Sequence, residues 1–336
     1  MDKKHISVVG VYGQGENFTT GQAVKCFELI SWFKEKYGNI QIGVVNTYAW
    51  KKNPMKLFIS MVKAFYSSDN IILMPAQHGL KVFAPMAAIL KMLFKKQVHY
   101  VVIGGWLADM LNQHKILCKC VSSFEGIYVE TEKMVCDLKK LGVKQALYMP
   151  NCRKYIDIQH LAIDKTSVIK VCTYSRVVRE KGILDAIKII QQANEFLGEK
   201  KFFLDVYGKV AQEFKNEFEV AVAQNKDIVK YCGVKNLDQG AETLRQYFCL
   251  LFPTYYNGEG FAGTILDAFV AKTPIIANDW KYNIEDELQD LSSVKLKKDD
   301  ASENIKKNIK IDKYRLKHNI SDNDWRVNLV KSFLYK

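Results

Sequence analysis

The 336-residue sequence predicts an α/β protein made of two doubly wound, Rossmann-like domains. Three observations predict this fold class. The length exceeds that of one hydrophobic core of usual size. Short β-rich segments alternate with segments of helical period, which is typical of parallel sheets covered by helices on both faces. The alternation restarts after the polar stretch 151–167, so we expect a linker there and a ligand cleft between the domains.

The expected elements follow in chain order. In the first half we expect strands at 5–11, 40–45, 70–74, 97–103, 126–129 and 145–149, and helices near 20–37, 54–67, 83–95, 106–118 and 131–141. In the second half we expect strands at 168–173, 201–207, 228–232, 248–252 and 274–277, and helices near 182–196, 210–224, 236–246 and 264–272. These elements give an N-terminal domain at 1–152 and a C-terminal domain at 168–315. A last helix at 316–336 is expected to pack back toward the N-terminal domain.

The composition is that of a cytoplasmic globular protein, with 48% hydrophobic and 25% charged residues. Eight cysteines are scattered without a C-x-x-C pair, so neither a zinc site nor a disulfide framework is expected, and the cysteines are interpreted as reduced core residues. The start of the chain lacks a secretory signal, and lysines interrupt every apolar stretch before about 18 residues, so no transmembrane helix is expected.

Positive charge is concentrated in the first half of the chain. Between residues 50 and 100, eight lysines face a single acid, Asp69. These lysines flank the apolar helical stretches "PMKLFISMVKAFY" and "VFAPMAAILKMLFKK", a pattern typical of helices on an anionic membrane surface. An ordinary solvated basic face is the alternative. Nucleic acid is not an expected partner, because this stretch has no arginine and the chain has no nucleic-acid-binding motif.

The stretch "FPTYYNGEGFAGTILDAF" predicts a ligand loop after strand 248–252. Its three glycines let the backbone approach a ligand, and the helix that begins at Thr264 directs its positive end toward an anion. Glu259 lies on the loop. Asp267 lies one turn into the helix, where its carboxylate can accept hydrogen bonds from a sugar or ribose diol. The alternative is a strand-to-helix turn whose acids only favour the helix dipole.

A second stretch, "YSRVVREKG", follows strand 168–173 and places Arg176, Arg179 and Lys181 at the turn into the next helix. A diphosphate leaving group carries two or more negative charges, which arginine and lysine neutralise where no metal is bound. The alternative is a surface charge cluster. Cations at a helix start oppose the helix dipole, however, so structure alone gives little reason for them.

The second half resembles glycosyltransferase family 4, the glycosyl transferases group 1, which are retaining enzymes of the GT-B fold. The resemblance rests on "SRVVREKG", "LDVYGKV", "YCGV" and "EGFAGTILDAFVAKTPIIA", in that order, and on "IYVETEKMVCDLKKLGVKQALYMPN", which is similar to the segment that closes the family's N-terminal domain. It covers most of residues 120–280, whereas the first 119 residues match only in outline. The implied architecture is GT-B, two Rossmann-like domains facing across a cleft.

The resemblance also implies roles for individual residues. Arg176 and Lys181 would hold the donor diphosphate, and Glu259 would contact the donor sugar near its reacting centre. Asp267 stands where the family has the glutamate that holds the ribose, and Ala262 stands where proline is common. Backbone contacts to the donor are implied for Gly260, Phe261 and Ala262.

Three sites in the first half are also candidates. The loop "GVYGQGENFTTGQ" offers Gly13 and Gly15 for close approach to the donor or the acceptor. His78 follows a strand, where many GT-B enzymes carry a functional residue. A loop histidine with one backbone hydrogen bond is the alternative. Trp106 in "GGWLAD" is interpreted either as a sugar-stacking residue at the acceptor site or as a core residue.

Together these features predict an enzyme that transfers a hexose from a nucleoside diphosphate sugar to a hydroxyl of a saccharide or lipid-linked acceptor, with retention. A role in surface polysaccharide or glycolipid synthesis at the inner membrane face is the expected context. No metal and no cofactor are expected, because Arg176 and Lys181 supply the positive charge. The alternatives are a nucleotide-sugar epimerase or phosphorylase on the same fold, and a non-catalytic nucleotide-sugar-binding subunit.

Overall fold

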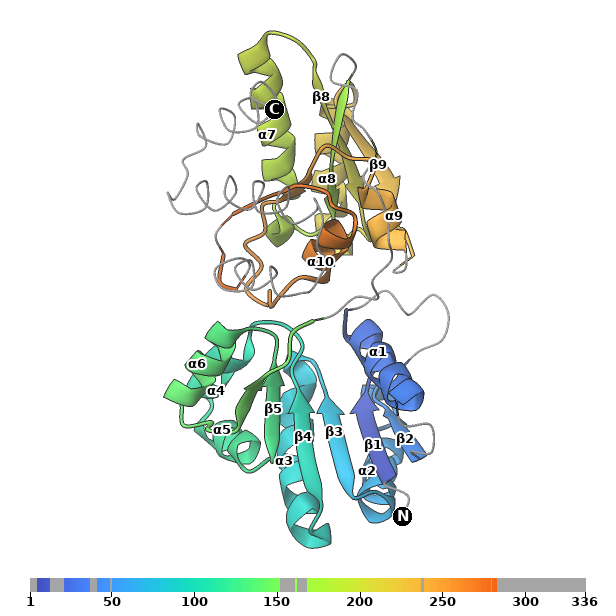
Figure 1. Ribbon diagram of the computed structural model, residues 1–336, viewed down its shortest axis with the longest axis vertical. Helices are drawn as coiled ribbons and strands as arrows, with labels where there is room; N and C mark the ends of the chain where they lie inside the picture. The colour runs from blue at the N-terminus through green and yellow to red at the C-terminus, as the bar shows by residue number, and fades with distance from the viewer. Residues whose placement is uncertain are drawn as a thin grey trace. The chain divides into compact units, whose positions relative to one another are not determined.

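The computed structural model describes residues 5–12, 21–36, 41–48, 50–151, 161, 168–236, 239–278 and 280–282. The chain folds into two compact units, unit 1 at Met1–Pro150 and unit 2 at Asn151–Lys336. Each unit is a parallel sheet flanked by helices, as Figure 1 shows. Most of the expected linker, the end of the expected C-terminal domain and the expected helix at 316–336 lie outside the described residues.

The sheet of unit 1 has six parallel strands in the order β2-β1-β3-β4-β5-β6. The strands are β1 His5–Gly10, β2 Gln41–Asn46, β3 Asn70–Met74, β4 Gln97–Val101, β5 Gly126–Val129 and β6 Ala146–Tyr148. The first strand lies inside the sheet, because β1 pairs with β2 on one side and β3 on the other. Its apolar side chains are buried on both faces, the pattern that a parallel sheet requires.

Helices cover this sheet between the strands. They are α1 Gly21–Lys36, η1 Trp50–Lys52, α2 Pro54–Ser67, α3 Gln77–Phe94, α4 Leu107–Gln113, α5 Lys115–Ser122 and α6 Glu132–Lys140. The start of α2 follows from its sequence, because the Asn53 side chain accepts a hydrogen bond from the Lys56 amide and Pro54 occupies the first turn.

Two helix predictions in unit 1 are wrong in their bounds. The helix expected near 83–95 begins at Gln77, so Pro85 lies inside it. The helix continues through the proline because the stripe that includes Leu80, Phe83 and Ala87 is buried, which offsets the one lost backbone hydrogen bond. The helix expected near 106–118 is two helices, α4 and α5, since His114 has a non-helical backbone with φ −129° and ψ 85°.

The sheet of unit 2 has five parallel strands in the order β11-β10-β7-β8-β9. The strands are β7 Ile169–Tyr174, β8 Phe202–Tyr207, β9 Val229–Gly233, β10 Leu250–Phe252 and β11 Ile275–Ala277. The helices are η2 Arg179–Lys181, α7 Ile183–Leu197, η3 Gln212–Phe214, α8 Lys215–Gln224, α9 Gly240–Leu244 and α10 Gly263–Val270. The helix expected near 236–246 is therefore shorter than predicted.

The strand order of unit 2 explains where its candidate loops meet. The chain runs from β7 outward to β8 and β9, then returns to the other side of β7 as β10 and β11. The loops that leave β7 and β10 therefore emerge side by side at the carboxyl edge of the sheet, at the reversal of strand order where ligands bind in open α/β sheets. A buried apolar cluster that includes Val171, Ile190 and Leu204 fixes one face of this sheet.

The described cysteines are not all core residues. Cys26, Cys172 and Cys249 are buried, whereas Cys136 is exposed. Burial raises the pKa of the Cys26 thiol to about 12. The expectation of core cysteines therefore holds for these three and fails for Cys136. In the described part of the chain, no helix is both long and apolar enough to cross a membrane.

Candidate functional site

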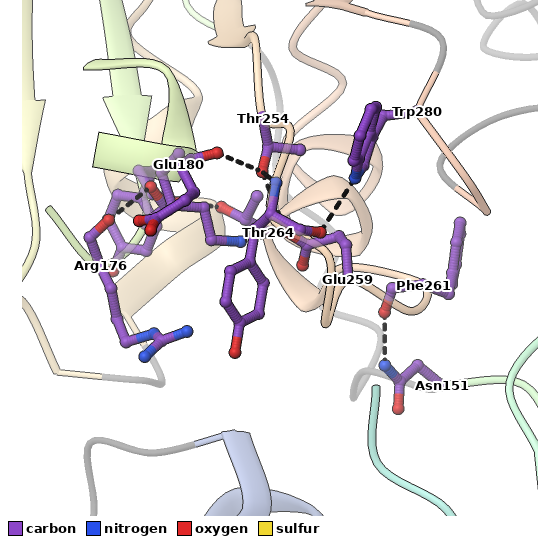
Figure 2. A network of polar contacts seen from close by, with 12 residues as sticks. Asn151, Arg176, Glu180, Thr254, Glu259, Phe261, Thr264 and Trp280 are labelled. Atoms are coloured by element: carbon purple, nitrogen blue, oxygen red, sulfur yellow. Dashed lines mark hydrogen bonds and ion pairs between the residues drawn. The ribbon is translucent and has the colours of Figure 1, made fainter. Parts of the chain in front are cut away.

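The turns after β7 and β10 bring together the charged residues that the sequence singled out in unit 2. The turn after β7 carries Arg176 and ends in η2, whose last residue is Lys181. The loop after β10 carries Glu259 and leads into α10. Figure 2 shows Arg176, Glu259 and Thr264 around the place where these two segments meet.

Lys181 and Glu259 form an ion pair between Nζ and Oε2, and each residue is only 8% exposed. Burial lowers the pKa of the Lys181 ammonium, the neighbouring Glu259 carboxylate opposes this shift, and Arg176 adds to it. A buried charge is costly unless it is paired and hydrogen-bonded. Each residue is therefore the counter-ion that allows the other to be buried.

Thr254 supports the Glu259 carboxylate from within the same loop. Its side chain is fully buried, and its Oγ1 lies 3.2 Å from Glu259 Oε2 and 3.3 Å from the Glu180 carbonyl oxygen. The hydroxyl has one proton, so it donates to one of these acceptors at a time. The Glu180 carbonyl also accepts a 2.8 Å hydrogen bond from the Tyr255 amide, so the two turns are joined at their backbones.

Sequence reasoning missed Thr254. The only signal was its place two residues beyond a buried strand end, in the loop that carries Glu259. A threonine there is an ordinary loop residue by composition. Its role appears only once the turn after β7 is seen to lie against it.

The close approach of the two turns requires Gly182. This residue has φ +68°, in the left-handed region, and a Cβ added there would lie 2.0 Å from the Pro253 carbonyl oxygen. No other residue fits this position without moving the loop after β10. The glycine of the "REKG" motif is therefore what brings Lys181 within reach of Glu259.

Arg176 is the exposed cation of the site. Its guanidinium carbon lies 5.1 Å from the centroid of the Tyr256 ring, a cation–π arrangement. The Lys181 ammonium lies 5.4 Å from the same ring. Within the described ranges, Arg176 has no ion-pair partner, so its charge is available to an anion.

Arg179, three residues further on, is different. It forms an ion pair with Glu217, on α8, and both side chains are at the surface. For Arg179, the structure therefore agrees with the alternative interpretation of this stretch as a surface charge cluster. The turn after β7 therefore contributes one exposed arginine and one buried lysine to the site.

The start of α10 faces the same place. Ala262 precedes the helix and its side chain caps no amide, so the N–H groups at the helix start receive no N-cap hydrogen bond, although the Ile265 amide donates to the Ala262 carbonyl at 3.0 Å. The Thr264 hydroxyl donates to the Tyr174 carbonyl at 2.7 Å, which ties the helix start to the end of β7 (Figure 2). The positive end of α10 is thus held at the carboxyl edge of the sheet.

The segment before α10 contributes backbone rather than side chains. Gly260, Phe261 and Ala262 are buried, and the Phe261 ring belongs to an apolar cluster of unit 2. The Asn151 side chain donates to the Phe261 carbonyl at 2.6 Å (Figure 2). That carbonyl is thereby fixed in place together with the turn into α10.

Asp267 lies one turn into α10 and is 8% exposed. A Cβ built on Gly240, the first residue of α9, would lie 2.7 Å from Asp267 Oδ2. The carboxylate therefore packs against the start of α9, where only a glycine leaves it room. The contact with a ribose remains a prediction.

The candidates in unit 1 are distributed over several elements. His78 is exposed in the first turn of α3. Trp106 is 7% exposed and its Nε1 donates to the Ile103 carbonyl at 2.7 Å, which favours its packing alternative over sugar stacking. Gly13 and Gly15 lie outside the described residues. The described residues include no group of three His, Cys, Asp or Glu side chains suited to a metal ion.

A buried ion pair at the carboxyl edge of unit 1 was not predicted. Lys25 on α1 reaches Glu130 Oε1 at 2.7 Å, directly after β5, and donates to the Val102 carbonyl at 3.2 Å. One turn earlier, Gln22 donates to the Met74 carbonyl at 2.6 Å. These bonds attach α1 to the ends of β3, β4 and β5. In the sequence, the only feature that marks this ion pair is Lys25, a polar residue between the apolar positions of a predicted helix.

Comparison with known proteins places the match in the half that carries the site. Residues 157–323 match the family model described as glycosyl transferases group 1. No curated protein matches the sequence.

Several solved structures are similar over most or nearly all of the chain. Anabaena Alr3699/HepE in complex with UDP superposes with a TM-score of 0.61 at 12% identity, over 99% of this chain and 100% of that one. The apo form of the lipopolysaccharide outer core galactosyltransferase WaaB gives 0.61 at 12%, over 98% and 99%. S. aureus TarM, in a complex that includes UDP and alpha-GlcNAc-glycerol, gives 0.53 at 16%, over 82% of this chain and 56% of that one. At such identities the likeness shows the fold, and it confirms the predicted GT-B class.

Proposed function

We propose that the protein transfers a hexose from a nucleoside diphosphate sugar to a hydroxyl, with retention, since residues 157–323 match the glycosyl transferases group 1 family and the chain has the fold of GT-B glycosyltransferases. One observation carries the proposal. Arg176, Lys181 and the positive end of α10 converge at the carboxyl edge of the unit 2 sheet.

The donor diphosphate is the anion that this arrangement suits. Arg176 offers a planar fork of N–H donors to one phosphate, and the ammonium of Lys181 lies behind it near the same Tyr256 ring. The uncapped amides of α10 offer donors to the other phosphate. That HepE and TarM were solved with UDP supports a nucleoside diphosphate at this fold.

The cations would lower the barrier by stabilising the leaving group. As the bond between the anomeric carbon and the phosphate oxygen breaks, negative charge grows on the diphosphate, and fixed cations stabilise this charge more than that of the bound donor. The acceptor oxygen then bonds to the anomeric carbon on the same face, and its proton passes to the departing phosphate oxygen. In this proposal the reaction needs neither a metal nor a cofactor, since Arg176 and Lys181 supply the positive charge.

Glu259 would orient the sugar rather than attack it. Its carboxylate already pairs with Lys181 and lies beside the Thr254 hydroxyl, and a carboxylate held by such donors is a weak nucleophile. Retention through a covalent intermediate therefore suits this site less well than same-face attack. Asp267 would hold the ribose.

For the acceptor, we propose a hydroxyl of a saccharide or a lipid-linked saccharide, in surface polysaccharide or glycolipid synthesis on the cytoplasmic side of the membrane. WaaB, described as a lipopolysaccharide outer core galactosyltransferase, is an example of this fold acting on such a molecule. His78 remains a candidate catalytic residue, and the loop with Gly13 and Gly15 remains a candidate for close approach to the donor or the acceptor.

The test is thermal-shift and calorimetric binding of UDP, GDP, ADP, CMP and their sugars, with and without magnesium. We expect one nucleoside diphosphate to stabilise the protein without metal, and Arg176→Ala to reduce this stabilisation strongly while Arg179→Ala preserves it. Slow hydrolysis of the matching donor sugar should follow. Binding without hydrolysis or transfer would support a non-catalytic subunit, isomerisation of the free donor would support an epimerase, and no binding at all would contradict the proposal.

A further inference from the structure

Unit 1 exposes an unusual amount of apolar surface on three neighbouring helices. The helix α3 packs against α2 on one side and α5 on the other. We call their outward surface the basic apolar face, and its large apolar side chains are Met55, Phe58, Ile59 and Tyr66 on α2, Val82, Ile89, Met92 and Leu93 on α3, and Ile116 on α5. The three helices are labelled in the lower part of Figure 1.

Packing against the core does not account for these apolar side chains. The inward stripe of α2 already contains Leu57, Met61 and Phe65, all buried, while Met55 and Tyr66 on its other side are 67% and 78% exposed. In α3, Ile89 and Leu93 repeat at helical spacing on the outward side. A surface helix of a globular protein normally has one apolar stripe. An exposed apolar surface of this extent indicates an interaction site.

Lysines surround the exposed apolar side chains. The exposed lysines of this face and of the adjoining turns are Lys51, Lys52, Lys56, Lys63, Lys81, Lys95, Lys115 and Lys119. None of the eight forms an ion pair with another described residue. Lys91 and Lys96 are different, because they pair with Glu125 and Asp69. The face therefore combines unneutralised positive charge with apolar side chains long enough to enter a lipid layer.

We propose that the basic apolar face binds the surface of an anionic lipid bilayer. Lysines attract anionic headgroups while apolar side chains enter the boundary of the acyl chains. Charge argues against a second copy of the chain, because a twofold dimer through this face would oppose the same lysines to one another. The apolar side chains argue against nucleic acid, whose phosphates offer them no partner.

Binding of this kind would position unit 1 for a lipid-borne acceptor, and only this consequence rests on the proposed transferase function. Both α2 and α3 begin near the carboxyl edge of the sheet, since each follows a strand of the parallel sheet. The face therefore extends up to the edge where ligands bind in such sheets. An acceptor hydroxyl carried by a lipid would be presented at that edge.

The experiment is co-sedimentation of the full chain with vesicles of phosphatidylcholine alone or with 30 mol% phosphatidylglycerol. We expect binding only to the anionic vesicles, weakening as NaCl is raised. The variant Lys52→Glu/Lys56→Glu/Lys63→Glu should lose affinity by at least about 100-fold, because each lysine near an anionic surface contributes roughly a factor of five. The matched control Lys209→Glu/Lys226→Glu/Lys230→Glu alters three exposed lysines of unit 2 and should lose little.

A second pair of variants tests the apolar part. Met55→Ser/Ile59→Ser should weaken vesicle binding, whereas Phe196→Ser/Val220→Ser, which alters exposed apolar residues of unit 2, should not. Circular dichroism and Tm confirm that each variant is folded, and UDP binding by calorimetry reports on the donor site separately. Absence of binding to anionic vesicles at low salt, equal loss in the control variants, or self-association that Met55→Ser/Ile59→Ser abolishes would overturn the proposal.

Discussion

The ammonium of Lys181 and the carboxylate of Glu259 neutralise each other at a place where both residues are only 8% exposed. In the proposed reaction the same ammonium must face a diphosphate. An incoming diphosphate therefore competes with Glu259 for Lys181, and its arrival would leave the carboxylate freer to bind the sugar. The ion pair thus couples donor binding to the arrangement of the group that contacts the sugar.

The variant Glu259→Gln tests this competition. Removing the carboxylate leaves Lys181 buried without its counter-ion, so we expect the free energy of unfolding to fall by about 3–5 kcal/mol. Bound UDP supplies the missing negative charge, so the stabilisation by UDP should be larger than in wild type even though transfer is lost. Thermal unfolding with and without UDP measures both effects. A variant in which UDP stabilises less than in wild type would contradict the competition.

Thr254→Val tests whether the hydroxyl positions Glu259. The substitution keeps the shape and removes two hydrogen bonds, the one that the hydroxyl donates and the one that it accepts from the Tyr256 amide at 3.3 Å. Each is worth about 1 kcal/mol, so the protein should remain folded. We expect kcat for donor hydrolysis to fall by roughly tenfold, with little change in KM for the donor. The control is Thr273→Val, which removes a buried hydroxyl bound to the Leu244 carbonyl at 2.9 Å. An equal loss of kcat in both variants would reduce Thr254 to a structural role.

Arg176→Ala and Arg179→Ala form a matched pair. Arg176 is exposed beside Tyr256 and has no described ion-pair partner, whereas Arg179 is paired with Glu217. Removing a charged hydrogen-bond donor to a phosphate costs about 1.5–3 kcal/mol, so Arg176→Ala should weaken UDP binding by roughly 10- to 100-fold. Arg179→Ala should change it less than about threefold. Calorimetry measures both, and similar losses in the two variants would argue against a specific phosphate contact.

The sequence predicted the residues of this site that lie in local motifs, but not the contacts between residues that are distant in the sequence. Arg176, Lys181 and Glu259 were predicted, because each lies in a motif next to a strand end and parallel strands end at one edge. The Lys181–Glu259 pair was not predicted, because the two residues are 78 positions apart in sequence and meet only through the strand order β10-β7. Thr254 and the Lys25–Glu130 pair were missed for the same reason, since no local pattern marks a long-range partner.

The bounds of the helices show a similar limit. The predicted helix started near 83, two residues before Pro85, yet α3 begins at Gln77 because burial of its inward stripe outweighs one missing hydrogen bond. Local propensity does not include that burial. The alternation of strands and helices, in contrast, is a local pattern repeated many times, and it predicted both parallel sheets.

The pH dependence of donor binding should reveal Lys181. Burial lowers its pKa in the folded protein below the ordinary 10.5. Between the folded and unfolded pKa values the unfolded chain binds more protons than the folded one. The cost of burying this ammonium is therefore present in full below the folded pKa and is lost as pH rises from the folded to the unfolded pKa. Over the same range the lysine loses the charge that a diphosphate needs, so UDP affinity should decline at a lower pH than an ordinary lysine would give.

The measurement is the Kd of UDP by calorimetry from pH 7 to pH 10.5. The control is Lys181→Arg, because a guanidinium keeps its charge over this range and should remove the decline. A decline of the same size in Lys181→Arg would assign the titration to another group.

Gly182→Ala and Gly198→Ala separate two costs of replacing a glycine that has a left-handed backbone, namely backbone strain and the steric clash of the added Cβ. Both glycines have similar backbones, with φ +68° and +71°, but a Cβ at Gly182 would lie 2.0 Å from the Pro253 carbonyl oxygen while one at Gly198 meets nothing within 4 Å. Gly198→Ala should therefore cost only the backbone strain, about 1 kcal/mol. Gly182→Ala should cost more than about 3 kcal/mol, because the loop after β10 must also move.

Displacement of that loop carries Glu259 away from Lys181, so Gly182→Ala should weaken UDP binding as well, whereas Gly198→Ala should leave it unchanged. Chemical denaturation gives the stability of each variant, and calorimetry at a temperature where both are folded gives the affinity. If Gly182→Ala lost stability yet bound UDP as wild type does, the contact between the two turns would be a packing feature that the donor site does not need.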